Sequence, residues 1–249
     1  MRILITGGTG LIGQALIHEL IQFEHDIILY TRDKHRAKSC FKSPLPRFES
    51  IIESLDDADF NKIDAVINLA GEPIVNKRWT SKQKQILCES RWLLTTNLAD
   101  KISSADIPPS LLISGSAIGM YGRQGDKQID ESFEDFYPEF SHELCKEWEA
   151  LALRTHSEKT RVCLLRTGIV LDENGGALAK MLPAFRLGLG GPIGKGQQGM
   201  SWIHIRDMVK LIIFLLNNSE LSGPFNATAP EPVSNKTFSK ALASQLNRP

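Results

Sequence analysis

Two kinds of hydrophobic pattern alternate along the first part of the chain. Short runs rich in Ile, Leu and Val predict buried strands, and longer segments with apolar residues every three or four positions predict amphipathic helices. The predicted strands are residues 3–5, 26–30, 65–69, 111–113 and 162–165. The predicted helices are a segment carrying Leu16, Leu20 and Ile21, then residues 82–104 and 141–155, the last with Trp148 on its apolar face. This alternation is typical of a parallel sheet covered by helices.

The pattern is less regular in two places. Between residues 34 and 60, with Pro44 and Pro46, a third strand is difficult to place. After residue 165, glycines punctuate residues 175–199, and the later elements are a short strand at 202–205, a helix at 206–217, a strand at 225–227 and a last helix at 236–246. We therefore expect an α/β fold. A Rossmann-type doubly wound parallel sheet would occupy residues 1–165, with residues 166–249 as a small C-terminal substrate-side region interleaved with it.

Charge and cysteine content narrow the class of protein. The 249 residues carry 29 Lys and Arg against 29 Asp and Glu, so there is no basic excess to attract nucleic acid or an anionic membrane. The four cysteines are scattered and form no Cys-x-x-Cys pair, which predicts no metal site. The longest apolar run, residues 211–216, is too short to cross a bilayer. We therefore expect a cytoplasmic protein with reduced thiols that acts on a small molecule.

The strongest motif follows the first predicted strand. Glycines stand three residues apart at Gly7, Gly10 and Gly13, after an apolar strand and at the start of an amphipathic helix. In that context the first glycine permits a tight turn, the second lets the backbone touch a diphosphate, and the third lets the helix pack on the strand. The N–H groups at the helix start favour phosphates. The motif predicts a dinucleotide site rather than a ligand-free turn.

The end of the second strand separates the two nicotinamide dinucleotides. An acidic residue there would bind the ribose 2′-hydroxyl of NAD, whereas an arginine suits the 2′-phosphate of NADP. Here Thr31 stands at the position of the acid and Arg32 follows it, with Lys34 and Arg36 adding positive charge. Asp33 leaves the alternative of an acid one position later. We favour NADP(H), because the planar guanidinium binds phosphate well.

Further segments follow the order of motifs in a known group of proteins. The segments typical of the superfamily are Gly7–Gly13, Asn68–Gly71, Ser114–Ala117 with Tyr121-Gly122, and Trp202–Asp207. The segments that point to one group within it are Arg78-Trp79, Glu89–Arg91, Lys146–Glu149 and Arg186–Gly194. On these segments the whole chain resembles the extended, atypical branch of the short-chain dehydrogenase/reductases. Within it, the chain resembles the nucleoside-diphosphate-sugar epimerase group, also called the SulA-like cell-division-inhibitor group. Chains of this group usually continue further, so we expect residues 166–249 to be a truncated form of the substrate-side region.

The resemblance implies roles for the residues at matching positions. The cofactor diphosphate would be held by Gly7, Thr9, Gly10, Leu11, Ile12 and Gly13, and the adenosine phosphate by Thr31, Arg32 and Arg36. The rest of the cofactor would meet Leu69, Ala70, Gly71, Glu72, Arg91, Ser114 and Lys146. Arg166, Thr167, Gly168, Ile169 and Val170 would shape the nicotinamide pocket. Ser116 occupies the position of the catalytic serine, and Lys146 that of the lysine that follows the catalytic tyrosine.

The chain departs from this family at the tyrosine. His142 stands four residues before Lys146, and positions four apart share one face of a helix. A histidine can move a proton at neutral pH, which makes His142 a candidate catalytic residue beside Ser116 and Lys146. The alternative is a solvated residue in the first turn. Tyr121 and Tyr137 are rival proton donors or structural residues, and His204 is either a half-buried strand residue or a group near the nicotinamide.

Two functions remain open from the sequence. The first is an NADP(H)-dependent oxidoreductase or epimerase of a small polar substrate, with nucleotide sugars suggested by the resemblance alone. The second is a sensor or scaffold that binds NADP(H) and catalyses nothing. Loss of the tyrosine favours the second function, whereas Ser116 and Lys146 favour the first.

Overall fold

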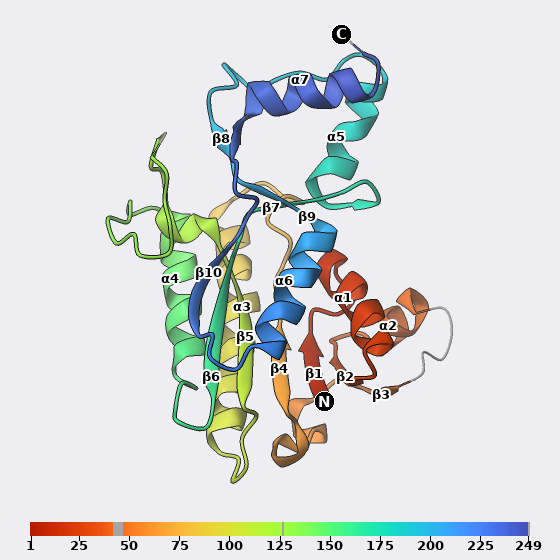
Figure 1. The fold of residues 1–249 in the computed structure, drawn as a ribbon, viewed down its shortest axis with the longest axis vertical. Helices are drawn as coiled ribbons and strands as arrows, with labels where there is room; N and C mark the ends of the chain where they lie inside the picture. The colour runs from red at the N-terminus through yellow and green to blue at the C-terminus, as the bar shows by residue number, and fades with distance from the viewer. Residues whose placement is uncertain (42–46, 126, 249) are drawn as a thin grey trace.

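A seven-stranded parallel sheet forms the centre of the molecule (Figure 1). The computed structural model describes residues 1–41, 47–125 and 127–248. The strand order is β10-β6-β5-β4-β1-β2-β3. The strands are β1 (Arg2–Thr6), β2 (Asp26–Tyr30), β3 (Phe48–Ile52), β4 (Ala65–Asn68), β5 (Leu111–Ala117), β6 (Arg161–Thr167) and β10 (Gly223–Ala227). The chain runs outward from β1 to β3 in one direction, and from β4 to β6 in the other, which confirms the doubly wound Rossmann-type fold.

Alternation along each strand divides the core between the two faces of the sheet. In β1, Ile3 and Ile5 pack on one face and Leu4 on the other. The first face is covered by α1 (Leu11–Gln22), α2 (Lys34–Cys40) and α6 (Ile205–Asn217). The second is covered by α3 (Ser81–Ser103) and α4 (Phe140–Leu153). Both faces are therefore closed, as a parallel sheet requires.

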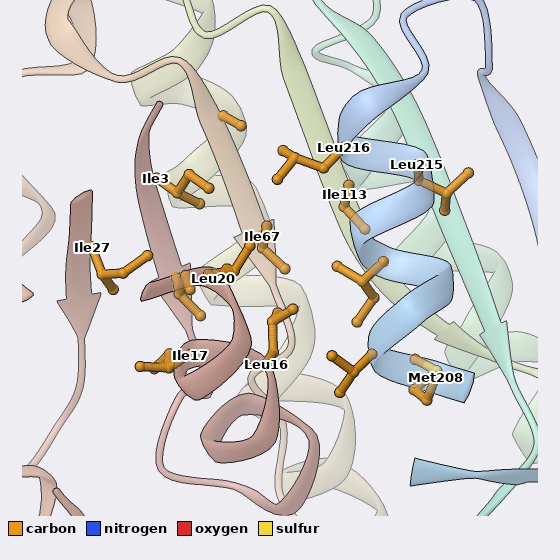
Figure 2. Close-up of a cluster of buried hydrophobic side chains, with 14 of the residues drawn as sticks. Ile3, Leu16, Ile17, Leu20, Ile27, Ile67, Ile113, Met208, Leu215 and Leu216 are labelled. Carbon is orange, nitrogen blue, oxygen red and sulfur yellow. The ribbon is translucent and has the colours of Figure 1, made fainter. Parts of the chain in front are cut away.

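The helices α1 and α6 pack side by side over the middle of the sheet (Figure 2). Leu16 and Leu20 point from α1, and Met208 and Leu216 from α6, into one cluster that also contains Ile67 of β4. Each of these side chains is at most 5% exposed. This cluster holds the start of α1 at the carboxyl end of β1.

A smaller group of elements lies beyond the carboxyl edge of the sheet (Figure 1). It comprises β7 (Ile169–Asp172), α5 (Gly176–Arg186), β8 (Gly199–Met200), β9 (Trp202–His204), β11 (Val233–Ser234) and α7 (Asn235–Gln245). The strands pair as two small sheets, β7 with β9 and β8 with β11. Because α6 and β10 return to the main sheet, residues after 165 contribute to both parts. The domain division at residue 165 stays a prediction.

Several predicted boundaries change in the structure. The third strand is β3, while Pro44 and Pro46 lie outside the described residues. β5 continues past residue 113 to Ala117, and β6 past residue 165 to Thr167, because the two strands pair along their whole length. Residues 166 and 167 therefore belong to the sheet itself. The sequence pattern did not predict the short 3₁₀ helices, because they are too short to show a hydrophobic period. They are η1 (Leu55–Asp57), η2 (Phe60–Lys62) and η3 (Ile118–Tyr121). None of the helices in the described residues combines the length and the hydropathy of a membrane span.

We expect Leu16→Ala to lower the free energy of unfolding by about 2–5 kcal/mol, because it leaves a cavity between α1, α6 and the sheet. Denaturant titration followed by circular dichroism measures this change. Glu19→Ala, on the exposed side of the same helix, is the control and should stay within about 0.5 kcal/mol. Equal effects from both variants would contradict the packing of Leu16 between α1, α6 and the sheet.

Candidate functional site

The turn between β1 and α1 brings backbone segments into direct contact. Gly7 has a φ of +71°, and a Cβ there would lie 2.6 Å from the carbonyl atoms of Leu69. A Cβ on Gly13 would lie 2.4 Å from the Gly7 oxygen and 2.5 Å from the Gly8 Cα. Neither position can carry a side chain without moving backbone. The turn therefore keeps a bare backbone surface at the carboxyl end of β1.

The start of α1 is built to receive an anion. Its N-cap is Gly10, which offers no side-chain oxygen, and its first turn contains no acidic residue. Asp33, Thr80, His204 and Ser234 cap the starts of α2, α3, α6 and α7 with side-chain acceptors, whereas α4 and α5 share with α1 the lack of such a cap. What distinguishes α1 is that its uncapped start directly follows the glycine turn at the carboxyl end of β1. The first N–H groups of α1, from Leu11 to Gly13, are thus left for another acceptor, while the Thr9 carbonyl accepts from Gln14 Nε2 at 2.9 Å. The diphosphate of a dinucleotide fits this donor set.

The end of β2 carries the residues expected to choose between the two dinucleotides. Asp33 accepts the backbone N–H of Arg36 at 2.9 Å through Oδ1 and so caps α2. The Thr31 hydroxyl accepts the Asp33 N–H at 3.2 Å. Asp33 is therefore engaged in the local turn, whereas the Arg32 side chain is exposed next to it. This arrangement favours Arg32 over Asp33 as the group that meets the adenosine ribose.

The loop after β4 rests on a half-buried arginine. Arg91 of α3 donates from Nη2 to the Glu72 carbonyl at 3.0 Å and from Nη1 to the Leu87 carbonyl at 2.9 Å. Its guanidinium lies 5.2 Å from the centre of the Trp148 ring, and a Cβ on Gly71 would come within 2.9 Å of it. Burial lowers the pKa of Arg91. Arg91 thus holds the backbone at Gly71 and Glu72, beside the half-buried Leu69 and Ala70. Its contact with a cofactor stays a prediction.

A buried chain of hydrogen bonds sets the rotation of α4. Thr6 donates to Asn68 Oδ1 at 2.6 Å, and Asn68 Nδ2 donates to Thr95 Oγ1 at 3.0 Å. Trp148 Nε1 also donates to Thr95 Oγ1 at 3.0 Å. Trp148 is therefore anchored to α3 and β4, and this anchor decides which side chains of α4 face the carboxyl ends of β5 and β6.

The side chains of α4 that face Ser116 are Cys145 and Glu149. The Ser116 hydroxyl donates to Glu149 Oε1 at 2.6 Å. Cys145 precedes Glu149 by one helical turn on the same buried face of α4. Ser116 and Glu149 are at most 5% exposed. Because the serine proton is held by a carboxylate, the serine oxygen can still accept a hydrogen bond from a ligand.

Arg166 completes this cluster from the neighbouring strand. It pairs with both oxygens of Glu149, through Nε at 3.0 Å and Nη2 at 2.9 Å. Its Nη1 donates to the Tyr121 hydroxyl at 3.0 Å, and that hydroxyl donates to Asn226 Oδ1 at 2.7 Å. Although burial opposes it, the hydrogen bonds with Glu149 and Tyr121 raise the pKa of Arg166, so the guanidinium stays charged. We call Ser116, Tyr121, Glu149, Arg166 and Asn226 the Ser116 cluster.

His142 and Lys146 lie elsewhere on α4. His142 is 6% exposed, its Nδ1 lies 2.6 Å from the Met120 carbonyl, and its ring stacks on Phe136. The alternative of a solvated His142 is therefore wrong. Lys146 is exposed, because one residue after Cys145 is a rotation of about 100° around the helix. Among the described residues, no hydrogen bond links either side chain to Ser116, so their catalytic roles stay predictions without a supporting contact.

Of the remaining candidates, two are exposed on the surface, and the others are buried or half-buried in or directly after the strands β5 and β6. Tyr137 is exposed and receives a hydrogen bond from Arg123, while His204 is exposed and caps α6 through Nδ1. The prediction that His204 is half-buried is therefore wrong. Ser114 is fully buried inside β5. At the carboxyl end of β6 stand Thr167, Gly168, Ile169 and Val170, all half-buried, and a Cβ on Gly168 would lie 2.5 Å from the Ser201 oxygen.

The apolar face of the helix that carries Trp148 indicates Cys145 and Glu149, which the motif comparison did not select. Trp148 was expected on the apolar face of its helix, and positions 145, 149 and 152 share that face with it. Aligning the helix by Trp148 would have selected Cys145 and Glu149 in place of Lys146, while His142 shares the buried face but lies two turns before Glu149. Asn226 had no such signal, because it reaches the cluster from a strand distant in the sequence.

A cavity of about 590 Å³ lies beside the ends of β2 and β3, away from the Ser116 cluster. It is lined by Tyr30, Glu53, Ser54, Leu55, Asp56, Asn97, Asp100, Lys101 and Ser104. Three of these residues are acidic, and Lys101 pairs with Asp56. This charge does not suit a phosphate, so we place no phosphate there.

The buried thiol of Cys145 provides a test of the site. Burial, and secondly the charge of Glu149, raise the pKa of Cys145 to about 11, so the thiol stays protonated at neutral pH. We expect iodoacetamide to modify Cys145 slowly at pH 7–8 and faster as the pH approaches 11, because the thiolate is the reactive form. Peptide mass spectrometry of the folded protein against denatured protein measures this. Rapid labelling at pH 7 in the folded state would contradict the buried, protonated thiol.

The sequence matches the NAD dependent epimerase/dehydratase family over residues 3–227. The chloroplastic homologue of epimerase family protein SDR39U1 from Arabidopsis thaliana is 39% identical over 254 residues, which cover 100% of this chain and 72% of that protein. The crystal structure of human epimerase family protein SDR39U1 with NADPH has a TM-score of 0.88 and 34% identity, covering 100% of this chain and 81% of that one. The nucleoside-diphosphate sugar epimerase from Corynebacterium glutamicum has a TM-score of 0.79 and 31% identity, covering 98% of this chain and 50% of that one. The chain belongs to the NAD dependent epimerase/dehydratase family.

Proposed function

We propose that this protein is an NADP(H)-dependent oxidoreductase or epimerase that acts on a small polar substrate. The observation that carries the proposal is the uncapped start of α1 above a glycine turn that tolerates no side chain, with Arg32 exposed at the end of the next strand. The human relative that was crystallised with NADPH supports the choice of cofactor.

The order of strands orients the cofactor. The diphosphate would lie at the carboxyl end of β1, held by the N–H groups of Leu11, Ile12 and Gly13. Thr31, Arg32 and Arg36 after β2 would bind the phosphorylated adenosine. Because β4, β5 and β6 lie on the other side of β1, the nicotinamide half would extend toward Ser116 and Arg166.

The bound cofactor would supply hydride acceptance and donation. The chain itself would hold the substrate oxygen near Ser116, beside the protonated thiol of Cys145. The small group of elements around α5 and α7 lies beyond this edge of the sheet and would cover the substrate (Figure 1). Nucleotide sugars are the substrate class we place first, in line with the name of the Corynebacterium glutamicum neighbour.

One observation favours a second candidate function. The Ser116 proton is held by Glu149, and the face of α4 in contact with Ser116 carries no tyrosine. A protein that binds NADP(H) as a sensor or scaffold without catalysis would need no proton donor at this position.

We expect the protein to bind NADPH more tightly than NADH, and Arg32→Ala to remove most of that preference. The loss of charge-assisted hydrogen bonds to the 2′-phosphate should weaken NADPH binding by roughly ten- to a hundredfold. Isothermal titration calorimetry with both dinucleotides measures it. The control is Arg154→Ala, at the exposed arginine that follows the last residue of α4, and it should leave both affinities unchanged. Equal affinities of the unmodified protein for NADPH and NADH would overturn the cofactor assignment.

We expect the unmodified protein to transfer deuterium from one face only of NADPH labelled at C4, when it is incubated with a panel of oxidised nucleotide sugars. Enzymes bind the nicotinamide in a fixed orientation, so transfer should be stereospecific. Mass spectrometry of the products detects it. Tight NADPH binding with no transfer to any member of a broad carbonyl panel would support the sensor or scaffold instead.

A further inference from the structure

An ion pair buried at the carboxyl edge of the sheet is the feature that the family motifs leave unexplained. The side chains of Arg166 and Glu149 are 7% and 6% exposed, and their closest charged atoms are 2.9 Å apart. Burying two charged side chains costs free energy of folding, because both lose their hydration. A pair of apolar side chains of similar size often stabilises a fold at least equally. A role in binding or chemistry would account for the pair better than stability does.

The position of the pair points to the nicotinamide half of the site. Arg166 and Ser116 are direct register partners in the neighbouring strands β6 and β5, near their carboxyl ends. Glu149 is one hydrogen bond from Ser116, at 2.6 Å. In doubly wound sheets, ligands bind outside the carboxyl ends of the strands. The glycine turn and Arg32 lie across β4 from this pair, at the opposite half of the same edge.

The negative charge of Glu149 and the positive charge of Arg166 neutralise each other through direct hydrogen bonds. Glu149 receives hydrogen bonds on both oxygens from Arg166 and a further one from Ser116. Arg166 gives its remaining hydrogen bond to Tyr121, which carries no charge of its own in this contact. Removal of either charged group would therefore leave one unit charge buried beside Ser116.

We propose that Glu149 and Arg166 are specificity-determining residues: as a neutral pair they prevent the site from discriminating by charge between the oxidised and the reduced cofactor. The inference rests on the proposed function, since it needs a bound nicotinamide dinucleotide. The nicotinamide ring is positively charged in NADP⁺ and neutral in NADPH. A balanced pair is indifferent to that difference, whereas Arg166 alone would repel the oxidised ring.

The expected size of the effect follows from Coulomb's law. At an effective dielectric constant of about 20, two unit charges within about 10 Å change a binding ratio by on the order of tenfold or more. Glu149→Gln removes the negative charge and keeps the size and hydrogen-bonding shape of the side chain. It should therefore raise the ratio of the dissociation constant of NADP⁺ to that of NADPH by at least about tenfold.

Isothermal titration calorimetry with NADP⁺ and NADPH tests the proposal on the whole chain. The variants are Glu149→Gln, the neutral double variant Glu149→Gln with Arg166→Met, and Glu147→Gln as the matched control. Glu147 is exposed on the other side of α4, so its substitution makes the same chemical change away from the site. We expect the double variant to return to within about threefold of the unmodified ratio, and the control to leave the ratio unchanged.

Each outcome decides one question. A ratio within about twofold of the unmodified protein in Glu149→Gln, or a double variant that keeps the altered ratio, overturns the inference. If Glu149→Gln does not fold, Arg166→Met makes the same comparison with the opposite sign, because it leaves the negative charge and should favour NADP⁺. An unmodified protein that binds neither NADP⁺ nor NADPH overturns the proposed function instead. General damage to the fold would weaken both ligands alike and leave the ratio unchanged.

Discussion

The contact between the backbone of the first turn and its neighbours is the constraint on which the candidate site depends. Gly7 lies against the carbonyl of Leu69, and Gly13 lies against Gly7 and Gly8, with no room for a side chain at either position. This contact draws the start of α1 down onto the end of β1. The packing of α1 with α6 holds it there from the other side. The N–H groups that would receive a diphosphate are therefore positioned by packing before any ligand arrives.

Electrostatics divides the edge of the sheet into two unlike halves. Around β1 and β2 the groups offered to a ligand are uncapped N–H donors and an exposed arginine, which suit phosphates. Around β5 and β6 the charges are buried and already paired, between Glu149 and Arg166. A neutral, hydrogen-bonded environment of this kind suits a ring that changes its charge during a reaction. The arrangement thus separates binding of the phosphates from the place where hydride chemistry would occur.

The rotation of α4, together with position along it, explains why residues conspicuous in the sequence are remote from Ser116. The bond from Trp148 to Thr95 and the burial of Cys145 and Ala152 fix the rotation of the helix. Lys146 then turns toward solvent. His142 shares the buried face but lies two turns before Glu149, where it meets Met120 and Phe136. A shift of one position along a helix moves a side chain by about 100°, which is enough to exchange a charged amine for a thiol in the site.

The sequence by itself determined the alternation of strands and helices, the parallel doubly wound sheet and the glycine turn, because these depend on local hydrophobic period and on backbone freedom at single residues. It also indicated Arg32, two residues after β2, and Ser116, next to the last residue of β5. Only the tertiary structure decided that Glu149, Arg166, Tyr121 and Asn226 meet at Ser116. These residues come from α4, β6, η3 and β10, and strand pairing and helix rotation, which bring them together, are set by contacts between segments far apart in the chain.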